Sequence, residues 1–226
     1  MIKVENIDVY GFEAAIRGMR NPMNSWDKSD SMFHIIDKDL YEIGENDLDL
    51  MQRLYKAGTE HRKYLRFVDV TMDICAPLYW WKEFDTYRFC EKNSCSTMHK
   101  IHSKEFTVDD FSHEHLLDEW GKEHEDELVC FDGEYTYSSK AILSDVVVPT
   151  LNHYRKLYLE TKSKRYWWQM IQLLPSSYNQ KRTVKFNYEV AVNIIRQRKG
   201  HKLDEWHVLV DELMKLPYLK EIAWMV

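Results

Sequence analysis

A dense group of small polar side chains in the middle of the chain is the first pattern with chemical potential. The run Asn93–Thr97 contains an amide, a thiol and hydroxyl groups, and Arg88 lies just before it. Donors at this density favour a cradle for an anion or a carbonyl group, and arginine binds phosphate in bidentate fashion. The plain alternative is a loop that makes local turns, with Arg88 paired to Asp85 or Glu91 on its own helix.

Other candidate binding residues lie on either side of this group. His61 is followed by two cations, and Arg198 belongs to the basic run Arg196–Lys199. Asn187 stands at the start of an expected helix. Basic runs are most often solvated helix faces, so these residues alone leave a surface role and a binding role open.

Paired histidines suggest a metal-dependent hydrolase as a further alternative. The spacings His99-x2-His102 and His113-x-His115 place two imidazoles on one face of a helix or a strand. The chain contains no H-E-x-x-H motif, and no carboxylate completes either pair in sequence. We therefore expect no metal site.

The cysteines and the N-terminus indicate a compartment. Cys75, Cys90, Cys95 and Cys130 form no C-x-x-C pair, which favours free thiols in a reducing cytoplasm. The first residues lack the apolar core of a signal peptide, and no apolar run approaches the length of a membrane span. We expect a cytoplasmic protein without a membrane partner.

The composition is that of a globular protein. Of 226 residues, 44% are hydrophobic and 30% are charged, which excludes a disordered chain. The net charge of -6 gives no support to nucleic-acid binding, so no nucleic-acid partner is expected. The acidic stretch Glu119 to Glu127 is interpreted as a solvated helix face. Trp80 and Trp81 are interpreted as core or interface residues, with ring stacking on a ligand as the alternative.

The apolar periodicity predicts a single α+β domain over residues 1–226. Alternation of apolar and polar residues predicts strands at 1–10, 67–74 and 183–186. Helical spacing, Pro77 and Pro149 as helix starts, and Gly200 as a helix stop predict the helices. The predicted helices cover residues 11–20, 46–57, 78–84, 145–173, 187–198, 204–215 and 217–224.

The order of strand, proline, helix and loop over residues 61–99 resembles that of flavin-dependent thymidylate synthases. That family carries the signature R-H-R-x7-S-x-R, which falls without a gap on Thr86-Tyr87-Arg88 and Ser96-Thr97-Met98. The longer form of the signature matches at Arg88, Asn93 and Ser96. His61 falls where the family has a histidine close to the flavin.

A second block near the C-terminus follows the family order as well. Leu174-Pro175, Tyr178, Asn187 and Arg198 match, with one residue fewer than in the family between Pro175 and Asn187. Leu203-Asp204 replaces an alanine-glutamine pair. The two blocks together span roughly residues 60–100 and 170–215.

The resemblance implies a thymidylate synthase-like fold, with a mixed or antiparallel sheet flanked by long helices, assembled as a homotetramer. It implies reductive methylation of dUMP or a related pyrimidine nucleotide, with FAD, NADPH and methylene-tetrahydrofolate. It also assigns six site residues: His61, Arg88 and Asn93 on the flavin side, and Ser96, Asn187 and Arg198 on the nucleotide side, with Arg198 also catalytic. Loss of Arg198 is expected to weaken nucleotide binding more than tenfold.

Several family cations are missing from this chain. Thr86 and Tyr87 replace two of the three signature cations, Met98 replaces the arginine of S-x-R, and Ile171 replaces a further arginine. Each lost charge-assisted hydrogen bond is worth about 1.5–3 kcal/mol. Two hypotheses follow: an enzyme with altered substrate or flavin affinity, or a non-catalytic or regulatory nucleotide-binding protein that keeps the scaffold.

Overall fold

The computed structural model describes residues 2–34, 41–118, 128–131 and 135–223. Its internal contacts divide the chain into two compact units. We refer to Lys3–Ile74, Phe84–Asn93 and Arg182–Val226 as the sheet unit, and to Met1–Ile2, Cys75–Glu83 and Ser94–Lys181 as the hairpin unit. The expectation of a single domain stays a prediction.

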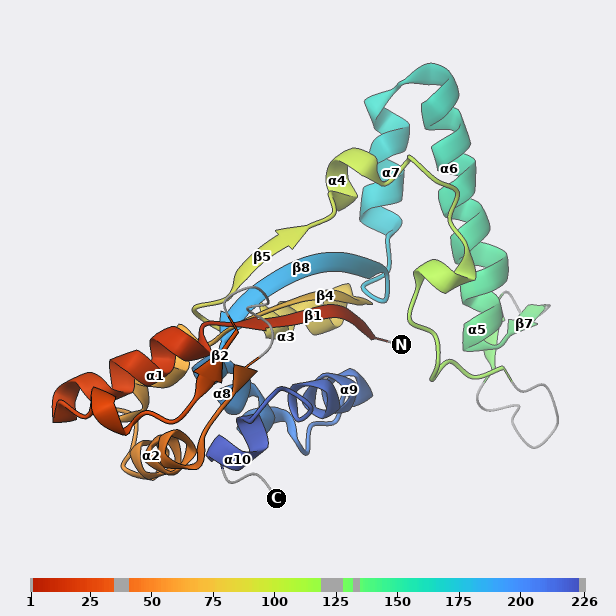
Figure 1. Cartoon of the computed structure of the whole chain (residues 1–226). Coiled ribbons are helices and arrows are strands. Elements are labelled where there is room, and N and C mark those ends of the chain that lie inside the picture. The colour runs from red at the N-terminus through yellow and green to blue at the C-terminus, as the bar shows by residue number, and fades with distance from the viewer. Residues whose placement is uncertain (1, 35–40, 119–127, 132–134, 224–226) are drawn as a thin grey trace. The chain divides into compact units, whose positions relative to one another are not determined.

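The framework of the sheet unit is a four-stranded antiparallel sheet in the order β1-β4-β8-β5 (Figure 1). Its strands are β1 (Lys3–Tyr10), β4 (Asp69–Pro77), β5 (Glu91–Ser94) and β8 (Asn179–Asn187). The end of β4 from Cys75, the last residue of β5 and the start of β8 up to Lys181 are assigned to the hairpin unit. Along β4, Val70, Met72 and Ile74 are buried, and the residues between them are partly exposed. This alternation is the reason the strand could be predicted, because successive side chains of a strand point to opposite faces.

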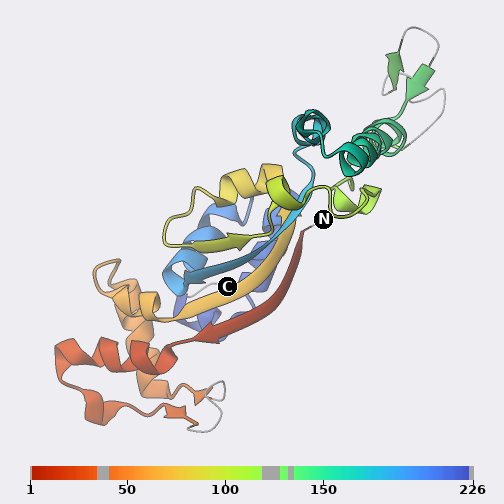
Figure 2. The same ribbon diagram turned by 90° about the horizontal axis from the view of Figure 1, so that it is seen from above.

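Helices α8 (Tyr188–Arg198) and α9 (Asp204–Leu213) lie along one face of this sheet (Figures 1 and 2). Aromatic side chains fill the space between α9 and the sheet. The ring of Phe84 stacks on Trp206 with centroids 6.2 Å apart and meets Phe186 of β8 edge-on at 6.5 Å. All three are buried, so this layer holds α9 against the sheet through Trp206.

Helix α1 (Phe12–Arg20) begins directly after β1, and the tight junction requires glycine. Gly11 has a φ of +96°, and a Cβ atom there would lie 2.1 Å from the carbonyl oxygen of Phe67. Only glycine tolerates both conditions. The other elements of this unit are α2 (Glu45–Lys56), α10 (Leu219–Ala223), the 3-10 helices η1 (Asn21–Met23), η2 (Trp26–Lys28) and η3 (Arg62–Phe67), and the strands β2 (Met32–Phe33) and β3 (Tyr41–Glu42).

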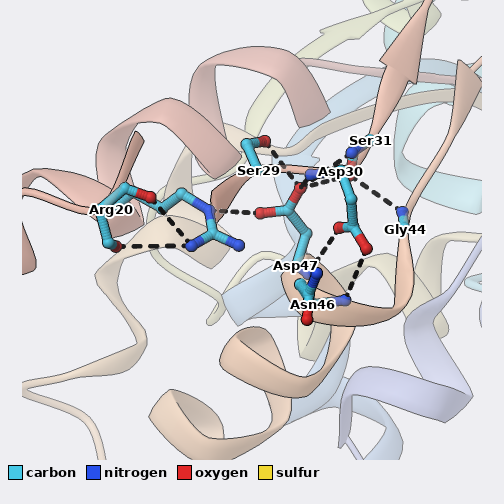
Figure 3. A network of polar contacts seen from close by, with 8 residues as sticks. Arg20, Ser29, Asp30, Ser31, Gly44, Asn46 and Asp47 are labelled. Carbon is cyan, nitrogen blue, oxygen red and sulfur yellow. Dashed lines mark hydrogen bonds and ion pairs between the residues drawn. The ribbon is translucent and has the colours of Figure 1, made fainter. Parts of the chain in front are cut away.

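A buried ion pair joins the end of α1 to the start of α2 (Figure 3). Arg20 Nε lies 2.6 Å from Asp47 Oδ1, and the two side chains are 4% and 0% exposed. Asp47 Oδ2 accepts hydrogen bonds from the hydroxyls of Ser31 and Ser29 at 2.7 and 2.8 Å. Burial alone would raise the pKa of Asp47, but the hydrogen bonds from Ser31, Ser29 and Arg20 outweigh it and lower the pKa below its ordinary value.

The hairpin unit contains the helices α6 (Val148–Thr161) and α7 (Lys164–Leu173), which are antiparallel and lie side by side (Figure 1). Phe106, Phe111, Leu151 and Met170 form the buried core beside this pair. The other elements are α3 (Leu78–Phe84, whose last residue belongs to the sheet unit), α4 (Thr97–Lys100), η4 (Val108–Asp110), α5 (Ser139–Ala141), the π-helix η6 (Ile142–Val147), and the strands β6 (Val129–Phe131) and β7 (Tyr135–Tyr137).

The long helix predicted at 145–173 is two helices. Lys162 adopts a left-handed conformation with a φ of 55° and ends α6, and α7 begins after Ser163. Thr161 Oγ1 accepts a hydrogen bond from the Ser163 backbone N–H at 3.1 Å, which stabilises the turn. Apolar periodicity does not separate one long helix from two helices of the same character, and this junction contains neither glycine nor proline.

The predicted α+β class is confirmed, as is the predicted burial of Trp80 and Trp81, which are 0% and 1% exposed. The acidic stretch Glu119 to Glu127 and the end of the last predicted helix lie outside the described residues. Within the described residues, every helix is too short or too polar to cross a membrane.

Candidate functional site

A pocket of about 470 Å³ opens along α8, in the sheet unit. We refer to it as the α8 pocket. Its volume lies in the range of small-molecule sites in proteins. The side chains around it are Arg66, Thr86, Tyr87, Arg88, Phe89, Asn187, Glu189, Val190, Asn193 and Gln197.

Three segments of the chain position these side chains. Helix α8 supplies one wall, because Glu189, Asn193 and Gln197 are spaced four residues apart and therefore share a helix face. The segment 86–89, which follows α3, supplies a second wall. Arg66, near the end of η3, completes the lining.

Asn187 performs a structural task at the edge of this pocket. It is the N-cap of α8, and its Oδ1 accepts a hydrogen bond from the Val190 backbone N–H at 3.1 Å. The carbonyl oxygen of the amide is thereby committed to the helix. The side-chain NH₂ group of Asn187 is the part that is left to donate to a ligand.

The charges around the α8 pocket are of both signs. Arg66 and Arg88 are exposed, and neither side chain forms an ion pair with another described residue. Glu189 is paired instead with Arg62, at 3.0 Å from Nη2, and their side chains are 13% and 9% exposed. The pocket therefore offers two guanidinium groups that form no ion pair with the described residues. Its carboxylate, Glu189, is already paired with Arg62.

Behind the pocket, Arg198 supports Tyr87. The Nε atom of Arg198 donates to the Tyr87 hydroxyl at 3.0 Å, and its guanidinium lies 4.4 Å from the ring centre of Trp206. The Tyr87 hydroxyl in turn donates to Gln197 Oε1 at 3.0 Å. This chain of contacts fixes two pocket side chains, Tyr87 and Gln197, although Arg198 itself does not line the pocket.

The structure brings some of the predicted site residues together. Arg88 and Asn187, predicted from separate sequence blocks, line the same pocket, and Arg198 contacts it through Tyr87. His61 is exposed in the turn before η3, and Asn93 is exposed on β5. Both belong to the sheet unit but not to the pocket lining.

Ser96 belongs to the hairpin unit and caps a helix there. Its Oγ accepts a hydrogen bond from the His99 backbone N–H at 3.2 Å, at the start of α4. The local-turn interpretation of the polar run is therefore correct for Ser96. Its predicted role in nucleotide binding stays a prediction.

The sequence patterns missed several pocket residues, among them Arg66, Asn193 and Gln197. A signal for the last two was present, since the predicted helix 187–198 places positions 189, 193 and 197 on one face with Asn187 at its start. Arg66 lies in a short basic segment, and only tertiary structure shows that it reaches the pocket.

The replaced signature positions fall in different surroundings. Thr86 and Tyr87 line the α8 pocket, where they contribute neutral groups in place of cations. Met98 is 49% exposed, and Ile171 packs against the core of the hairpin unit. The cluster of three or more histidine, cysteine, aspartate or glutamate side chains that a metal site requires does not occur among the described residues.

Burial raises the pKa of the Cys90 thiol to about 11, with smaller effects from Lys92, Asp85 and Glu91. Cys90 directly follows the pocket segment 86–89. Because its pKa is raised, its thiol is neutral near pH 7. The thiolate is the nucleophilic form of cysteine, so this side chain is not an activated nucleophile.

No family model matches this chain, and no curated protein sequence does. Solved structures, by contrast, are similar over the full length. Thymidylate Synthase X from Helicobacter pylori, crystallised with FAD and dUMP, has a TM-score of 0.65 and 18% identity, covering 100% of this chain and 98% of that chain. A second structure of the Helicobacter pylori flavin-dependent enzyme, also complexed with FAD and dUMP, gives 0.64 and 17%, covering 99% and 98%.

The UMP/dUMP methylase PolB from Streptomyces cacaoi, bound with 5-Br dUMP, has a TM-score of 0.61 and 15% identity, covering 99% of this chain and 94% of that chain. At identities this low, the similarity establishes the fold and not the activity. The chain has the flavin-dependent thymidylate synthase fold, as the sequence resemblance implied.

Proposed function

We propose that this protein is a flavin-dependent thymidylate synthase-like enzyme that reductively methylates dUMP or a related pyrimidine nucleotide at the α8 pocket. The observation that carries the proposal is the meeting of Arg88 and Asn187 in one pocket. The two residues were assigned to the flavin and to the nucleotide from separate sequence blocks. A flavin can pass a hydride to a nucleotide only when the reacting atoms approach to about 3–3.5 Å, so residues of both groups must share a site.

The side chains of the α8 pocket fit phosphorylated ring ligands. Arg66 and Arg88 supply the fixed positive charge that a phosphate needs. The Asn187 amide NH₂ donates to a ring carbonyl, and Phe89, which is 84% exposed, offers an aromatic surface for stacking. FAD supplies the redox chemistry when it is bound, and the chain binds and orients the ligands.

The proposal includes NADPH as the reductant and methylene-tetrahydrofolate as the carbon donor. It also includes assembly into a homotetramer and a location in the cytoplasm. The assembly is supported by the fold, because the resemblance implies sites between subunits. The location is supported by Cys90 and Cys95, which are unbridged thiols.

The first test is an absorbance spectrum from 300 to 600 nm, recorded before and after addition of FAD and dUMP. We expect flavin bands that remain with the protein through desalting and shift when dUMP is added. Arg88→Ala is expected to weaken ligand binding at least tenfold, which corresponds to the loss of one charge-assisted hydrogen bond of about 1.5–3 kcal/mol.

Because Arg88 is exposed, its removal should leave the melting temperature within about 2 °C, consistent with surface substitutions of less than about 0.5 kcal/mol. Arg17→Ala is a matched control, an exposed arginine of the same unit outside the α8 pocket. Unaltered binding of both FAD and dUMP to Arg88→Ala would contradict the assignment of the pocket.

The second candidate function is a non-catalytic nucleotide-binding protein. The neutral groups of Thr86 and Tyr87 in the pocket favour it, since they reduce the positive charge that binds FAD. A colourless protein that binds dUMP, and gains no flavin bands at saturating FAD, would establish this alternative over the enzyme.

A further inference from the structure

Glu189, which lines the α8 pocket, has a side-chain oxygen without a hydrogen-bond partner among the described residues. Its Oε1 atom accepts two hydrogen bonds from Arg62, from Nε at 3.2 Å and from Nη2 at 3.0 Å. Its Oε2 atom is buried and has no hydrogen-bond partner among the described residues. Arg62 thus fixes the carboxylate by one oxygen and leaves the other without a donor.

An unsatisfied buried acceptor is costly, by about 1–3 kcal/mol and more for a charged group. Native proteins rarely retain one without a reason, and a ligand donor is one such reason. Glu189 lines the pocket, so the missing donor can come from a bound molecule. A phosphate cannot serve, because it carries no donor when ionised and would be repelled by the carboxylate.

The neighbours of Glu189 on α8 narrow the chemistry of that donor. Asn193 and Gln197 follow at intervals of four residues on the same face and also line the pocket. Tyr87 occupies the Gln197 carbonyl oxygen, so the NH₂ group of Gln197 is the end left to donate. The wall therefore combines one anionic acceptor with amide donors.

We infer that Glu189 recognises a cyclic imide, with Oε2 accepting the hydrogen bond of the ring N–H and the amide of Asn193, one turn along α8, donating to an adjoining carbonyl group. An imide edge has an N–H flanked by carbonyl groups, so a carboxylate acceptor with an amide donor beside it complements the N–H and one adjoining carbonyl. Uracil and the flavin ring both have this edge. The inference rests on the proposed function and identifies which edge of the ligand the pocket reads.

The test combines a variant with a modified ligand, measured by isothermal titration calorimetry. Glu189→Gln keeps the size of the side chain, and its amide oxygen can stay on Arg62 while an NH₂ donor faces the pocket. We expect at least tenfold weaker binding of the recognised ligand. The ligands are dUMP and FAD, each compared with its analogue methylated at the imide nitrogen.

For the recognised ligand, methylation should weaken binding to the unaltered protein at least tenfold. It should change binding to Glu189→Gln by less than threefold, because the interaction is already lost. If dUMP shows this pattern, uracil is the imide; if FAD shows it, the flavin is. Glu13→Gln is the control, since Glu13 is an arginine-paired glutamate of the same unit outside the α8 pocket.

The outcomes separate this inference from the proposed function. Equal binding of parent and methylated ligands to the unaltered protein would overturn the role of Glu189 while leaving the nucleotide and flavin proposal intact. The comparison needs no variant, so it holds even if Glu189→Gln fails to fold. Absence of both dUMP and FAD binding to the unaltered protein would overturn the proposed function, and this inference with it.

Discussion

Arg198 illustrates how a side chain can matter to a pocket that it does not line. It donates to the Tyr87 hydroxyl and lies over Trp206, and Tyr87 passes the constraint on to Gln197. Removal of the guanidinium leaves Tyr87 with one hydrogen bond fewer and opens space beside Trp206. Under the proposed function, the effect on a bound ligand would therefore be indirect, through the positions of Tyr87 and Gln197.

We expect Arg198→Ala to weaken dUMP binding more than tenfold, measured by calorimetry. Tyr87→Phe separates the two contacts of Arg198, because it removes the hydroxyl but keeps the ring over which Arg198 lies at 5.7 Å. If the relay through Tyr87 is responsible, Tyr87→Phe should reproduce most of the loss. Binding unchanged in Arg198→Ala would remove Arg198 from the functional residues.

At the level of elements, the junction of α1 and α2 depends on a single carboxylate. Asp47 is fully buried, forms an ion pair with Arg20 and accepts hydrogen bonds from the hydroxyls of Ser29 and Ser31 (Figure 3). Asp30 caps the start of α2, because its carboxylate accepts a hydrogen bond from the Asp47 backbone N–H at 3.1 Å. The loss of one partner from a buried ion pair leaves an uncompensated charge. The two helices are thus joined by a polar network in which loss of the Asp47 carboxylate removes the contacts to Arg20, Ser29 and Ser31 at once.

We expect Asp47→Asn to lower the free energy of unfolding by about 3–5 kcal/mol at pH 7. Because the pKa of Asp47 is lowered in the folded state, its contribution is present above the ordinary pKa of about 3.9 and is lost as the pH falls through the folded pKa. The deficit of the variant should therefore shrink below about pH 4. Urea unfolding at several pH values measures both effects.

Asp49→Asn is the control on the same helix. Asp49 is 63% exposed and pairs with Arg53 at 2.8 Å, and such exposed helix pairs contribute only about 0.3–0.5 kcal/mol. If both substitutions lowered the free energy of unfolding equally at pH 7, the buried network would contribute no more to stability than the exposed pair, and the prediction would be refuted.

The elements that could be predicted from the sequence are those with a strong local pattern. The alternation in β4 and the apolar face of α8 arise from burial on one side, so the sequence carries them directly. The break at Lys162 depends on a non-glycine residue in a left-handed conformation, which has no local signature. The unpaired Oε2 of Glu189 arises because Arg62, 127 positions away in the chain, binds only the other oxygen of the carboxylate. Only the fold reveals this contact.

At the scale of the whole molecule, the assembly is the main prediction. Phe89 is 84% exposed at the rim of the α8 pocket, and Phe67 of the same unit is 55% exposed. Large exposed aromatic groups near a site are typical of surfaces that a ligand or another subunit covers. Assembly into a tetramer would enclose a pocket that is open in the single chain.

Light scattering coupled to size-exclusion chromatography measures the mass of the assembly. We expect about four times the 27.3 kDa of one chain. A mass of 27.3 kDa across a wide concentration range would refute the tetramer. It would also mean that the α8 pocket must bind its ligands without a second subunit.

The capping role of Asn187 bears on how much its match to the family pattern says about ligand binding. A lineage that had abandoned ligand binding would still be under selection to keep a capping side chain at the start of α8. Arg88 is exposed and makes no hydrogen bond or ion pair with another described residue, so mutational drift could replace it at no cost to folding. Arg88 is therefore the more informative of the two matches to the family pattern, because an Asn187 that only caps α8 would also be found in a scaffold that binds nothing.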